Sequence, residues 1–493
     1  MLPPAETLAA SLALDRDAPA PLQDQLVDFF RAAVLAGRLR PGTRVPSSRA
    51  LAAEQQVARI TVVQAYDRLV AEGFLVARRG AGLFVAADLP DLQRPVAPAT
   101  AAPRPAPPAP PARPDLKLAP RSYARADLTP GLPALDLFPW TEWSRLTARV
   151  LRRRPVAALA YADPRGDAGL RQAIAAHLGG MRGIGCDADQ IVIVAGSQQG
   201  IDLAARAVAG PGEACWYEEP GYPIGRAALQ AAGLTVMPVP VDGDGLDVAA
   251  GRSLAPDARL AMVAPAHQYP LGSTMTLARR LALLDWAEQA QGWIIEDDYD
   301  GEFRHGGRPL APLHALDGGR RVFHLGTFSK SLAPGLRLGY LVVPEPLIGR
   351  VATLKSAADR SAPGLEQLVL AAFIAEGRFA AHLRRMRLVY AERQRHLLAA
   401  LTETAAGLLD PGTVPEAGLH LSALLCRPGD DVAMARAAQA AGVGAAPLST
   451  YYATAAAARP GFVIGFAGTP APRIATAVHR LAGAIIAPET AAP

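Results

Sequence analysis

A proline-rich stretch divides this chain of 493 residues into two parts. Eleven prolines fall between Pro90 and Pro120, among alanines and arginines and with almost no large apolar residues. Such a segment has too little apolar surface to form a core, and it favours an extended, polyproline-type conformation. The sequence therefore predicts a tether over residues 89–125, a small domain before it at 15–88 and a large domain after it at 126–493.

The composition excludes several classes of protein. Half of the residues are apolar and 19% are charged, as in ordinary globular proteins. Three scattered cysteines, without metal-binding spacing, fit a reducing compartment and no disulfide framework. No apolar run is long enough to cross a membrane, and residues 1–14 lack the basic start of a signal peptide. We therefore expect a cytoplasmic protein with no membrane span and no metal site.

The small domain has the pattern of three helices followed by a hairpin. Helical periodicity predicts helices at 21–36 and from about 60 to 72, with a short helix between them that ends near Gln56. Two apolar runs, 74–77 and 83–86, then flank a basic tip. This order of elements describes a winged helix-turn-helix.

Positive charge is concentrated in this domain. Eight arginines face three acidic residues between Gly37 and Val85, a local charge of +5 that suits contact with DNA phosphates. The predicted DNA contacts come from the turn before the short helix, the start of the second helix and the hairpin tip: Arg44, Ser47, Arg49, Arg59, Thr61, Gln64, Arg78 and Arg79. A small oligomerisation module with a charged face is the alternative.

The amino-acid sequence of the segment decides between a DNA-binding domain and an oligomerisation module. The stretch PLQDQLVDFFRAAVLAGRLRPGTRVPSSRALA, which continues into VARITVVQAYDRLVAEGFLVARRGAGLFVA, closely resembles the DNA-binding domain of the GntR family of bacterial transcription regulators. The resemblance covers residues 21–86 and implies binding to double-stranded DNA.

The large domain carries an unusual lysine. The chain has fifty basic residues, and only three of them are lysines: Lys117, Lys330 and Lys355. Lys330 stands between two serines, in GTFSKSLAPGLR, directly after an apolar run. Unlike a guanidinium, a lysine amine can lose its proton and attack a carbonyl to form a Schiff base. The hydroxyls and the positive charge that a phosphate-bearing aldehyde needs come from the same stretch: Thr327, Ser329 and Arg337. A solvated lysine in an ordinary loop is the alternative.

Alternating apolar and amphipathic runs from residue 126 onward predict an α/β domain with a mostly parallel sheet. A buried strand at 190–195 leads to Ser197 and Gln198 at the start of a helix, where free N–H groups favour an anion. The apolar strand at 292–299 ends in acids, and Asp297 and Tyr299 face the same side of it. A carboxylate suits the pyridinium nitrogen of an electron-withdrawing cofactor, and a phenol suits its ring oxygen. The alternative for Asp297 is a residue that caps the next turn.

The order of these motifs, including PGY at 220–222, HQYPLG at 267–272 and EDDY at 296–299, resembles fold-type I aminotransferases, which depend on pyridoxal 5′-phosphate (PLP). Joined to a GntR domain, it resembles the MocR/GabR subfamily of regulators. The resemblance implies that Lys330 forms the Schiff base, Asp297 holds the pyridine nitrogen and Tyr299 bonds the ring hydroxyl. It further implies roles at the phosphate or over the ring for the remaining residues: Ser197, Gln198, Thr327, Ser329, Arg337 and Tyr222. Tyr161 matches a tyrosine that reaches the cofactor of the partner subunit, which implies a homodimer.

The chain departs from the aminotransferase pattern at the substrate carboxylate. Val463 takes the place of the carboxylate-binding arginine on a late strand, with Arg459 four residues before it. Ile224 stands where a GABA-sensing relative has another arginine, with Arg226 nearby, and Tyr269 replaces the asparagine of an N-P-x-G turn.

We therefore expect a PLP-containing transcription regulator in which a small amino compound, or PLP itself, shifts two DNA-binding modules over paired half-sites. A working aminotransferase with an appended DNA-binding module is the runner-up. A DNA-binding protein whose second domain is an empty scaffold is the third hypothesis.

Overall fold

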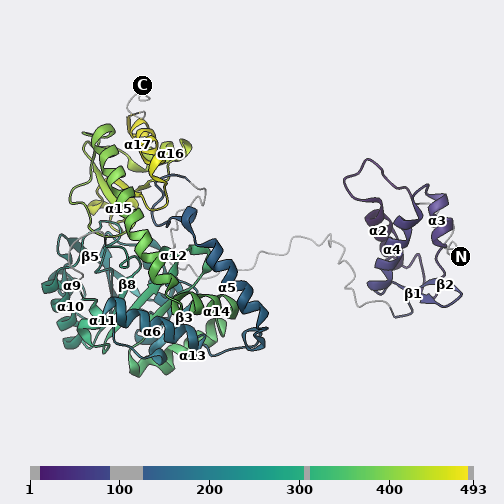
Figure 1. Ribbon diagram of the computed structural model, residues 1–493, viewed down its shortest axis with the longest axis horizontal. Helices are drawn as coiled ribbons and strands as arrows, with labels where there is room; N and C mark the ends of the chain where they lie inside the picture. Colours follow the sequence, from purple (N-terminus) through teal and green to yellow (C-terminus); the bar gives the residue numbers. More distant parts are fainter. Residues whose placement is uncertain (1–11, 89–125, 305–310, 487–493) are drawn as a thin grey trace, which may run out of the picture. The chain divides into compact units, whose positions relative to one another are not determined.

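The computed structural model describes residues 12–88, 126–304 and 311–486. The predicted tether, 89–125, lies outside these residues. The chain divides into two compact units, Met1–Ala112 and Arg113–Pro493, which are described separately below (Figure 1). None of the described helices is long and apolar enough to cross a membrane.

The first unit contains three helices and a two-stranded hairpin: α2 (Leu22–Leu35), α3 (Ser48–Glu54), α4 (Arg59–Ala71), β1 (Leu75–Arg78) and β2 (Gly82–Val85). These bounds agree with the predicted elements to within about two residues. The helices share one apolar core, in which Phe30 of α2 makes an edge-to-face ring contact with Tyr66 of α4. The strands pair antiparallel, with Leu75 opposite Val85. This unit is therefore a winged helix-turn-helix.

The second unit is built on an eight-stranded sheet with the strand order β3-β10-β9-β8-β7-β4-β5-β6. Its strands are β3 (Ile191–Val194), β4 (Ala214–Glu219), β5 (Thr235–Asp242), β6 (Gly245–Leu246), β7 (Leu260–Val263), β8 (Trp293–Asp298), β9 (Val322–Thr327) and β10 (Gly339–Val342). The strands from β9 to β5 are parallel, whereas β10 and β6 run against their neighbours. The sheet is thus mostly parallel, as the sequence predicts.

Helices cover both faces of this sheet: α5 (Trp140–Arg152), α6 (Ala168–Arg182), α7 (Ser197–Val208), α8 (Pro223–Ala231), α9 (Val248–Leu254), α10 (Leu277–Gln289), α11 (Leu313–Asp317), α12 (Phe328–Ser331), α13 (Ile348–Asp359) and α14 (Gly364–Ala375). Successive strand residues point to opposite faces. In β3, Val192 and Val194 pack with α7, α8 and α13, whereas Ile191 and Ile193 pack with α5, α6 and α14. Because both faces are covered, the central strands are mainly apolar, and acids stand at the carboxyl ends of β4 and β8.

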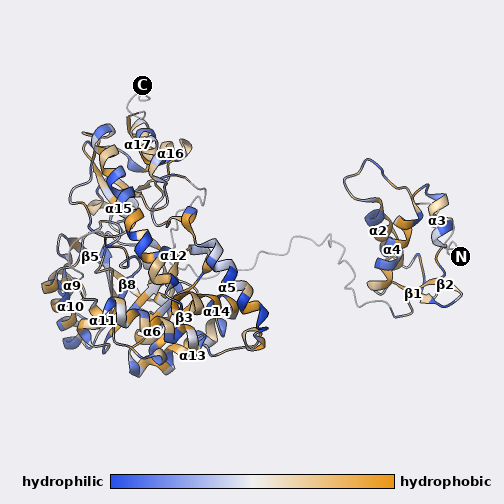
Figure 2. Ribbon diagram, in the orientation of Figure 1, coloured by the Kyte–Doolittle hydropathy of each residue, from blue (hydrophilic) through white to orange (hydrophobic). Residues whose placement is uncertain are grey.

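A long helix, α15 (Arg378–Thr404), connects this layer to a second, smaller sheet. That sheet has the order β11-β12-β14-β13 and is antiparallel: β11 (Leu409–Asp410), β12 (His420–Leu425), β13 (Ala446–Pro447) and β14 (Gly461–Gly465). Two helices, α16 (Asp431–Ala440) and α17 (Ala471–Ile486), share its core. Hydrophobic and hydrophilic residues alternate along α15 (Figure 2), since one face packs on this core and the other is exposed.

One predicted helix boundary is wrong. The amphipathic pattern after Gly166 predicts a helix from Ala168 to Leu178, but α6 continues to Arg182. Gly179 and Gly180 tolerate helical dihedral angles, and the helix stops only at Gly183, which adopts φ 67°.

Candidate functional site

The DNA-facing residues predicted for the first unit lie on three neighbouring elements. Arg59 is the first residue of α4, and Thr61 and Gln64 follow in its first turns. On the hairpin, the guanidinium of Arg78 lies 4.6 Å from the ring centre of Phe84, and Arg44 forms a backbone bridge with that same phenylalanine. The hairpin therefore holds Arg78 over an aromatic ring and pairs with the backbone of Arg44.

The predicted phosphate contacts are solvent-exposed and unpaired. Within residues 12–88, the ion pairs involve Arg31 and Arg68, which bind acids on α2 and at the end of α4. None of those pairs includes the five exposed arginines at positions 44, 49, 59, 78 and 79. Ser47 has a structural task as well, because its hydroxyl accepts a hydrogen bond from the backbone N–H of Ala50 and caps α3. These five arginines, together with Arg16, Arg38 and Arg40, are exposed and form no ion pair within residues 12–88, which suits a polyanion.

The second unit has a cavity of about 250 Å³ at the edge of the large sheet. Residues that follow the carboxyl ends of the parallel strands surround it, which is where open α/β sheets bind ligands. It is lined by every predicted cofactor-binding residue except Tyr161: Ser197, Gln198, Tyr222, Asp297, Tyr299, Thr327, Ser329, Lys330 and Arg337. The fold therefore brings together side chains that are more than a hundred residues apart in sequence.

One end of the cavity suits a phosphate. The first turn of α7 begins at Ser197, so its free N–H groups are available to an anion. Gly196 before it has φ 111°, and a Cβ atom at this position would lie 3.2 Å from Nη2 of Arg337. Thr327 caps α12 by accepting a hydrogen bond from the backbone N–H of Ser329 at 3.2 Å. The guanidinium therefore packs directly against the start of a helix, where both attract negative charge.

Lys330 lies on α12, where the sheet edge and the start of the unit meet. Its Nζ donates a hydrogen bond to the carbonyl oxygen of Gly131 at 2.6 Å. Gly131 has φ 78°, and a Cβ atom there would lie 3.0 Å from the same Nζ. The backbone conformation therefore favours a glycine at this position, where the lysine amine also approaches closely.

Two buried carboxyl groups face the cavity. Burial, together with the charges of Asp298 and Asp300, raises the pKa of Asp297 to about 7. Its Oδ1 is buried and has no hydrogen-bond partner among the described residues. Burial also raises the pKa of Glu218 to about 8, although this side chain accepts hydrogen bonds from the N–H of Ala264 and from Gln268. The cavity thus contains an acid that lacks a donor.

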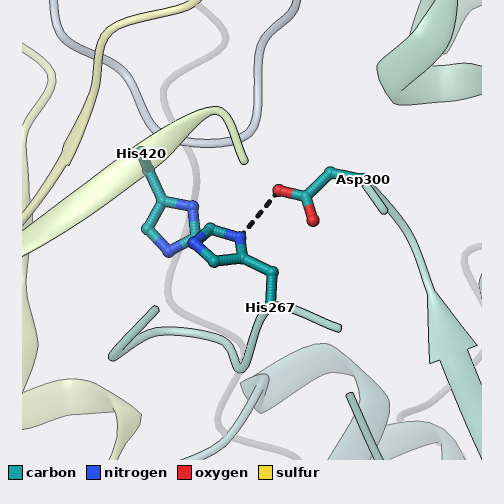
Figure 3. Close-up of side chains that lie close together, drawn as sticks. All are labelled: His267, Asp300 and His420. Atoms are coloured by element: carbon teal, nitrogen blue, oxygen red, sulfur yellow. Dashed lines mark hydrogen bonds and ion pairs between the residues drawn. The ribbon is translucent and has the colours of Figure 1, made fainter. Parts of the chain in front are cut away.

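Tyr299 is oriented by a relay of buried side chains, of which Figure 3 shows the hydrogen-bonded pair of His267 and Asp300. Nδ1 of His267 lies 2.9 Å from Oδ2 of Asp300 and 3.0 Å from the phenol oxygen of Tyr299. A carboxylate only accepts hydrogen bonds, so this Nδ1 must carry the proton. The phenol oxygen of Tyr299 is then an acceptor from His267, and its own proton remains for a group in the cavity.

His420 completes the cluster from the smaller sheet, with its ring centre 4.7 Å from that of His267. Burial holds the pKa of His420 well below its usual range, and its Nε2 donates to the carbonyl oxygen of Pro270 at 3.1 Å. One ligand atom from each of His267, Asp300 and His420 lies within 4.8 Å of the others, a spacing that a metal could use. The hydrogen bonds above engage Nδ1 of His267 and Nε2 of His420, and Nε2 of His267 has no hydrogen-bond partner among the described residues.

The remaining wall is aromatic. The phenol oxygens of Tyr269 and Tyr451 lie 3.0 Å apart, and Tyr269 packs edge-to-face on Tyr222. Val463 of β14 is fully buried in the same cluster. Neither Arg459, which is exposed, nor the half-buried Arg226 lines the cavity. The place at which the resemblance puts a carboxylate-binding arginine is therefore apolar in this chain.

Tyr161 lies outside the cavity and is 81% exposed, with the guanidinium of Arg360 4.6 Å from its ring centre. Sequence reasoning also missed lining residues. Glu218 had a detectable signal, since it ends an apolar strand as Asp297 does. Gly131 and His420 had none, because each reaches the cavity from a segment remote from every motif.

Comparisons with known proteins agree with this division. Residues 140–481 match the family model of aminotransferase class I and II, and residues 22–85 match that of bacterial regulatory proteins of the gntR family. Over 484 residues the chain is 38% identical to the probable rhizopine catabolism regulatory protein MocR of Rhizobium meliloti, which covers 97% of each chain. It is 33% identical to the pyridoxine biosynthesis transcriptional regulator PdxR of Corynebacterium glutamicum, over 92% of this chain and 94% of that protein.

Among solved structures, the fold is similar to LysN, an α-aminoadipate aminotransferase from Thermus thermophilus crystallised with N-(5′-phosphopyridoxyl)-L-leucine. The TM-score is 0.68 at 27% identity, over 75% of this chain and 94% of that one. The cavity fits a phosphopyridoxyl group. Buried Oδ1 of Asp297 lacks a donor that a pyridinium N–H would supply, and the start of α7 with Arg337 suits the phosphate.

Proposed function

Because the chain belongs to the GntR-type bacterial regulators whose second domain is of the aminotransferase class I and II family, we propose that it is a homodimeric regulator that senses a small molecule through PLP. The observation that carries the proposal is the pairing, in one chain, of two features: a cavity containing Lys330 and Asp297, whose Oδ1 has no partner among the described residues, and a winged helix whose predicted DNA-contact arginines form no ion pair within residues 12–88. Neither the cavity nor the winged helix would by itself predict the presence of the other.

When bound, PLP supplies an aldehyde that can be linked to a lysine and a ring that withdraws electrons. In our proposal Lys330 forms that link, and Asp297 accepts the ring N–H. Tyr299, oriented by His267, donates to the ring oxygen, and Tyr222 covers the ring. Residues at the phosphate end hold the phosphate group: Ser197, Gln198, Thr327, Ser329 and Arg337.

On the DNA side, we assign α4 to the major groove, with Arg59, Thr61 and Gln64 at its leading end. The turn before α3 and the hairpin tip would bind phosphates or a neighbouring groove. The domain boundaries 15–88, 89–125 and 126–493 belong to the same proposal, with the proline-rich segment as a tether that sets how far apart two half-sites can lie.

A homodimer is supported by an exposed apolar segment. Four apolar side chains within about twenty residues of the sequence are between 69% and 81% exposed: Trp140, Val156, Leu159 and Tyr161. Apolar side chains gathered in this way usually mark an interface. A second copy of this chain is the proposed occupant, and Tyr161 would then reach the partner's cofactor phosphate. A regulator of transcription in a bacterium works in the cytoplasm, which completes the proposal.

The signal is an amino compound that binds beside the cofactor, or PLP itself. The second case is supported by the name of PdxR, a regulator of pyridoxine biosynthesis. In either case the ligand acts by binding one arrangement of the DNA-binding modules better than another.

A second candidate function is transamination, since Lys330, Asp297 and Tyr299 line one cavity together. Absorbance spectra of the purified protein separate the two functions. We expect one amino compound to change the cofactor spectrum to a species that persists. If the original spectrum instead returns when a 2-oxo acid is added, the aminotransferase function is favoured.

Selection of binding sites from random duplex DNA tests the regulator itself. With full-length, PLP-loaded protein we expect enrichment of two copies of one short half-site. Recovery of single copies would contradict the homodimer, and no enrichment at all would contradict the DNA-binding role.

A further inference from the structure

We infer that Ile60 determines part of the DNA sequence that this protein reads, by packing against the 5-methyl group of a thymine in the major groove. The inference rests on the proposed function, which places the leading end of α4 in that groove. It adds a residue outside the predicted set of DNA contacts, and it names the base that this residue recognises.

Ile60 is a large apolar side chain that is turned to solvent. It is 61% exposed, compared with 41% for Val76 of the hairpin. The core of the first unit is closed without it, because α4 contributes its buried residues from another side: Val62, Ala65, Tyr66 and Leu69. Packing within this unit therefore does not account for an isoleucine at the position.

The direction of Ile60 follows from helix geometry. Each residue of an α-helix advances by about 100° around the axis, so Ile60 lies almost opposite the buried side of α4. Arg59 and Thr61 lie on its two flanks, whereas Gln64, one turn further along, shares the side of Ile60. Arg59 also leans toward α3, because its Nε donates a hydrogen bond to Oγ of Ser48 at 3.4 Å. Ile60 therefore occupies the middle of the outward face at the start of α4.

The charges around Ile60 direct the start of α4, and not its middle, toward a duplex. Arg59 is its neighbour in sequence, and Arg49 lies on the first turn of α3, which meets α4 through the hydrogen bond to Ser48. Both arginines are exposed and suit DNA phosphates. Asp67 is exposed on the same face as Ile60 about two turns further along, where phosphates would repel its carboxylate. The residues that face the bases are therefore those of the first two turns.

Thymine is the base that suits an apolar side chain in the major groove. Its 5-methyl group is the apolar part of the pattern that the base edges present there, and the remaining groups are hydrogen-bond donors and acceptors. An isoleucine packed on those polar groups would remove their water without replacing its hydrogen bonds, which is costly. Gln64, on the same face, has the amide that binds adenine through two hydrogen bonds. We therefore expect A·T pairs under the start of α4.

Deoxyuridine substitution tests the inference on the full-length, PLP-loaded protein. The half-site selected from random DNA is synthesised with each thymine replaced in turn by deoxyuridine, which removes only the methyl group. We expect one substitution in each half-site to weaken binding about fourfold, the effect of losing one methyl-sized apolar contact. Binding is measured by fluorescence anisotropy at a single salt concentration, because phosphate contacts vary with salt.

The variant Ile60→Ala shows whether Ile60 is the residue that contacts the methyl group. The side chain is exposed and alanine favours helices, so α4 should be retained. We expect this variant to bind the thymine site at least about fourfold more weakly and to lose the distinction between thymine and deoxyuridine. Val70→Ala is the matched control, because Val70 is an exposed apolar residue at the other end of α4. It should retain both the affinity and the distinction.

Equal affinity for thymine and deoxyuridine at every position of the half-site would overturn the inference, as would a half-site without A·T pairs. A methyl effect that persists unchanged in Ile60→Ala would overturn it as well, since another residue would then make the contact. The proposed function is scored separately, by enrichment of a half-site and by cofactor absorbance. A protein that binds its selected site without a methyl effect contradicts only the role of Ile60, whereas the lack of any enriched half-site contradicts both.

Discussion

Nδ1 of His267 lies 2.9 Å from Oδ2 of Asp300, and the pair is fully buried. This contact fixes the proton of the imidazole on the nitrogen that also meets Tyr299. The phenol proton of Tyr299 is thereby directed away from the histidine, and in our proposal it is donated to the ring oxygen of the cofactor.

We expect Tyr299→Phe to raise the pKa of the cofactor–lysine link by about one pH unit, because a donor to the ring oxygen is lost. Asp300→Leu should give a shift in the same direction, since the histidine proton is then free to move and Nδ1 can accept from Tyr299. The measurement is a pH titration of the cofactor absorbance. If the Asp300 variant had the same cofactor pKa as the unsubstituted protein and unchanged circular dichroism, the proposed relay from Asp300 through His267 to Tyr299 would be contradicted.

Lys330→Ala should abolish the visible absorbance of the linked cofactor completely, because a methyl group cannot form a covalent bond to an aldehyde. Lys330→Arg keeps the charge and should lose the absorbance as well, since a guanidinium stays protonated. Lys117→Ala is the matched control and should retain it. Visible absorbance of the covalent link in either Lys330 variant would show that another residue is the partner.

The affinity of the apoprotein for PLP should fall below pH 7. The pKa of Asp297 is raised to about 7, so this carboxyl is ionised above that pH and ready to accept from a protonated ring nitrogen. Below it the carboxyl must first lose a proton, which costs up to about tenfold in affinity for each pH unit. Asp297→Asn should bind PLP more weakly and lose this dependence. If the unsubstituted protein and the Asp297→Asn variant had the same pH profile, the pH dependence of PLP affinity would have to come from another group.

Arg59→Ala should weaken binding to selected DNA by about 1–3 kcal/mol if the side chain reads a base. If it binds a phosphate instead, the slope of affinity against salt concentration should fall by about one. Cofactor absorbance should be unchanged in either case. Arg68→Ala is the matched control, because Arg68 lies at the other end of α4 and pairs with Asp24 and Glu72. Equal losses in the two variants at matched salt would contradict the position of α4 in the groove.

Much of this molecule could be predicted because its signals are local. The helix-turn-helix follows from periodicity and turn residues within sixty residues, and Lys330 stands out because lysine is rare in an arginine-rich chain. The strand-end acids pointed to Asp297 because a carboxylate at the end of an apolar strand needs a partner.

Other features depend on contacts that no local pattern encodes. His420 comes from the smaller sheet and meets His267 only because α15 brings that sheet over the edge of the larger one. Gly131 looked like one of many glycines until the chain placed its carbonyl against Lys330. Tyr161 stays a prediction, since its expected partner is a second copy of the chain.

The hydrogen bond between Lys330 and Gly131 bears on how the two halves of the protein communicate. Gly131 lies six residues beyond residue 125, the last residue of the proposed tether. Gly131 is therefore both near the end of the proposed tether and part of the cavity wall. When the Lys330 amine forms a covalent link, it has fewer protons to donate to the Gly131 carbonyl. The cofactor link at Lys330 and the start of the domain thus share one hydrogen bond. We therefore expect a change at Lys330 to reach the start of this domain through that single hydrogen bond.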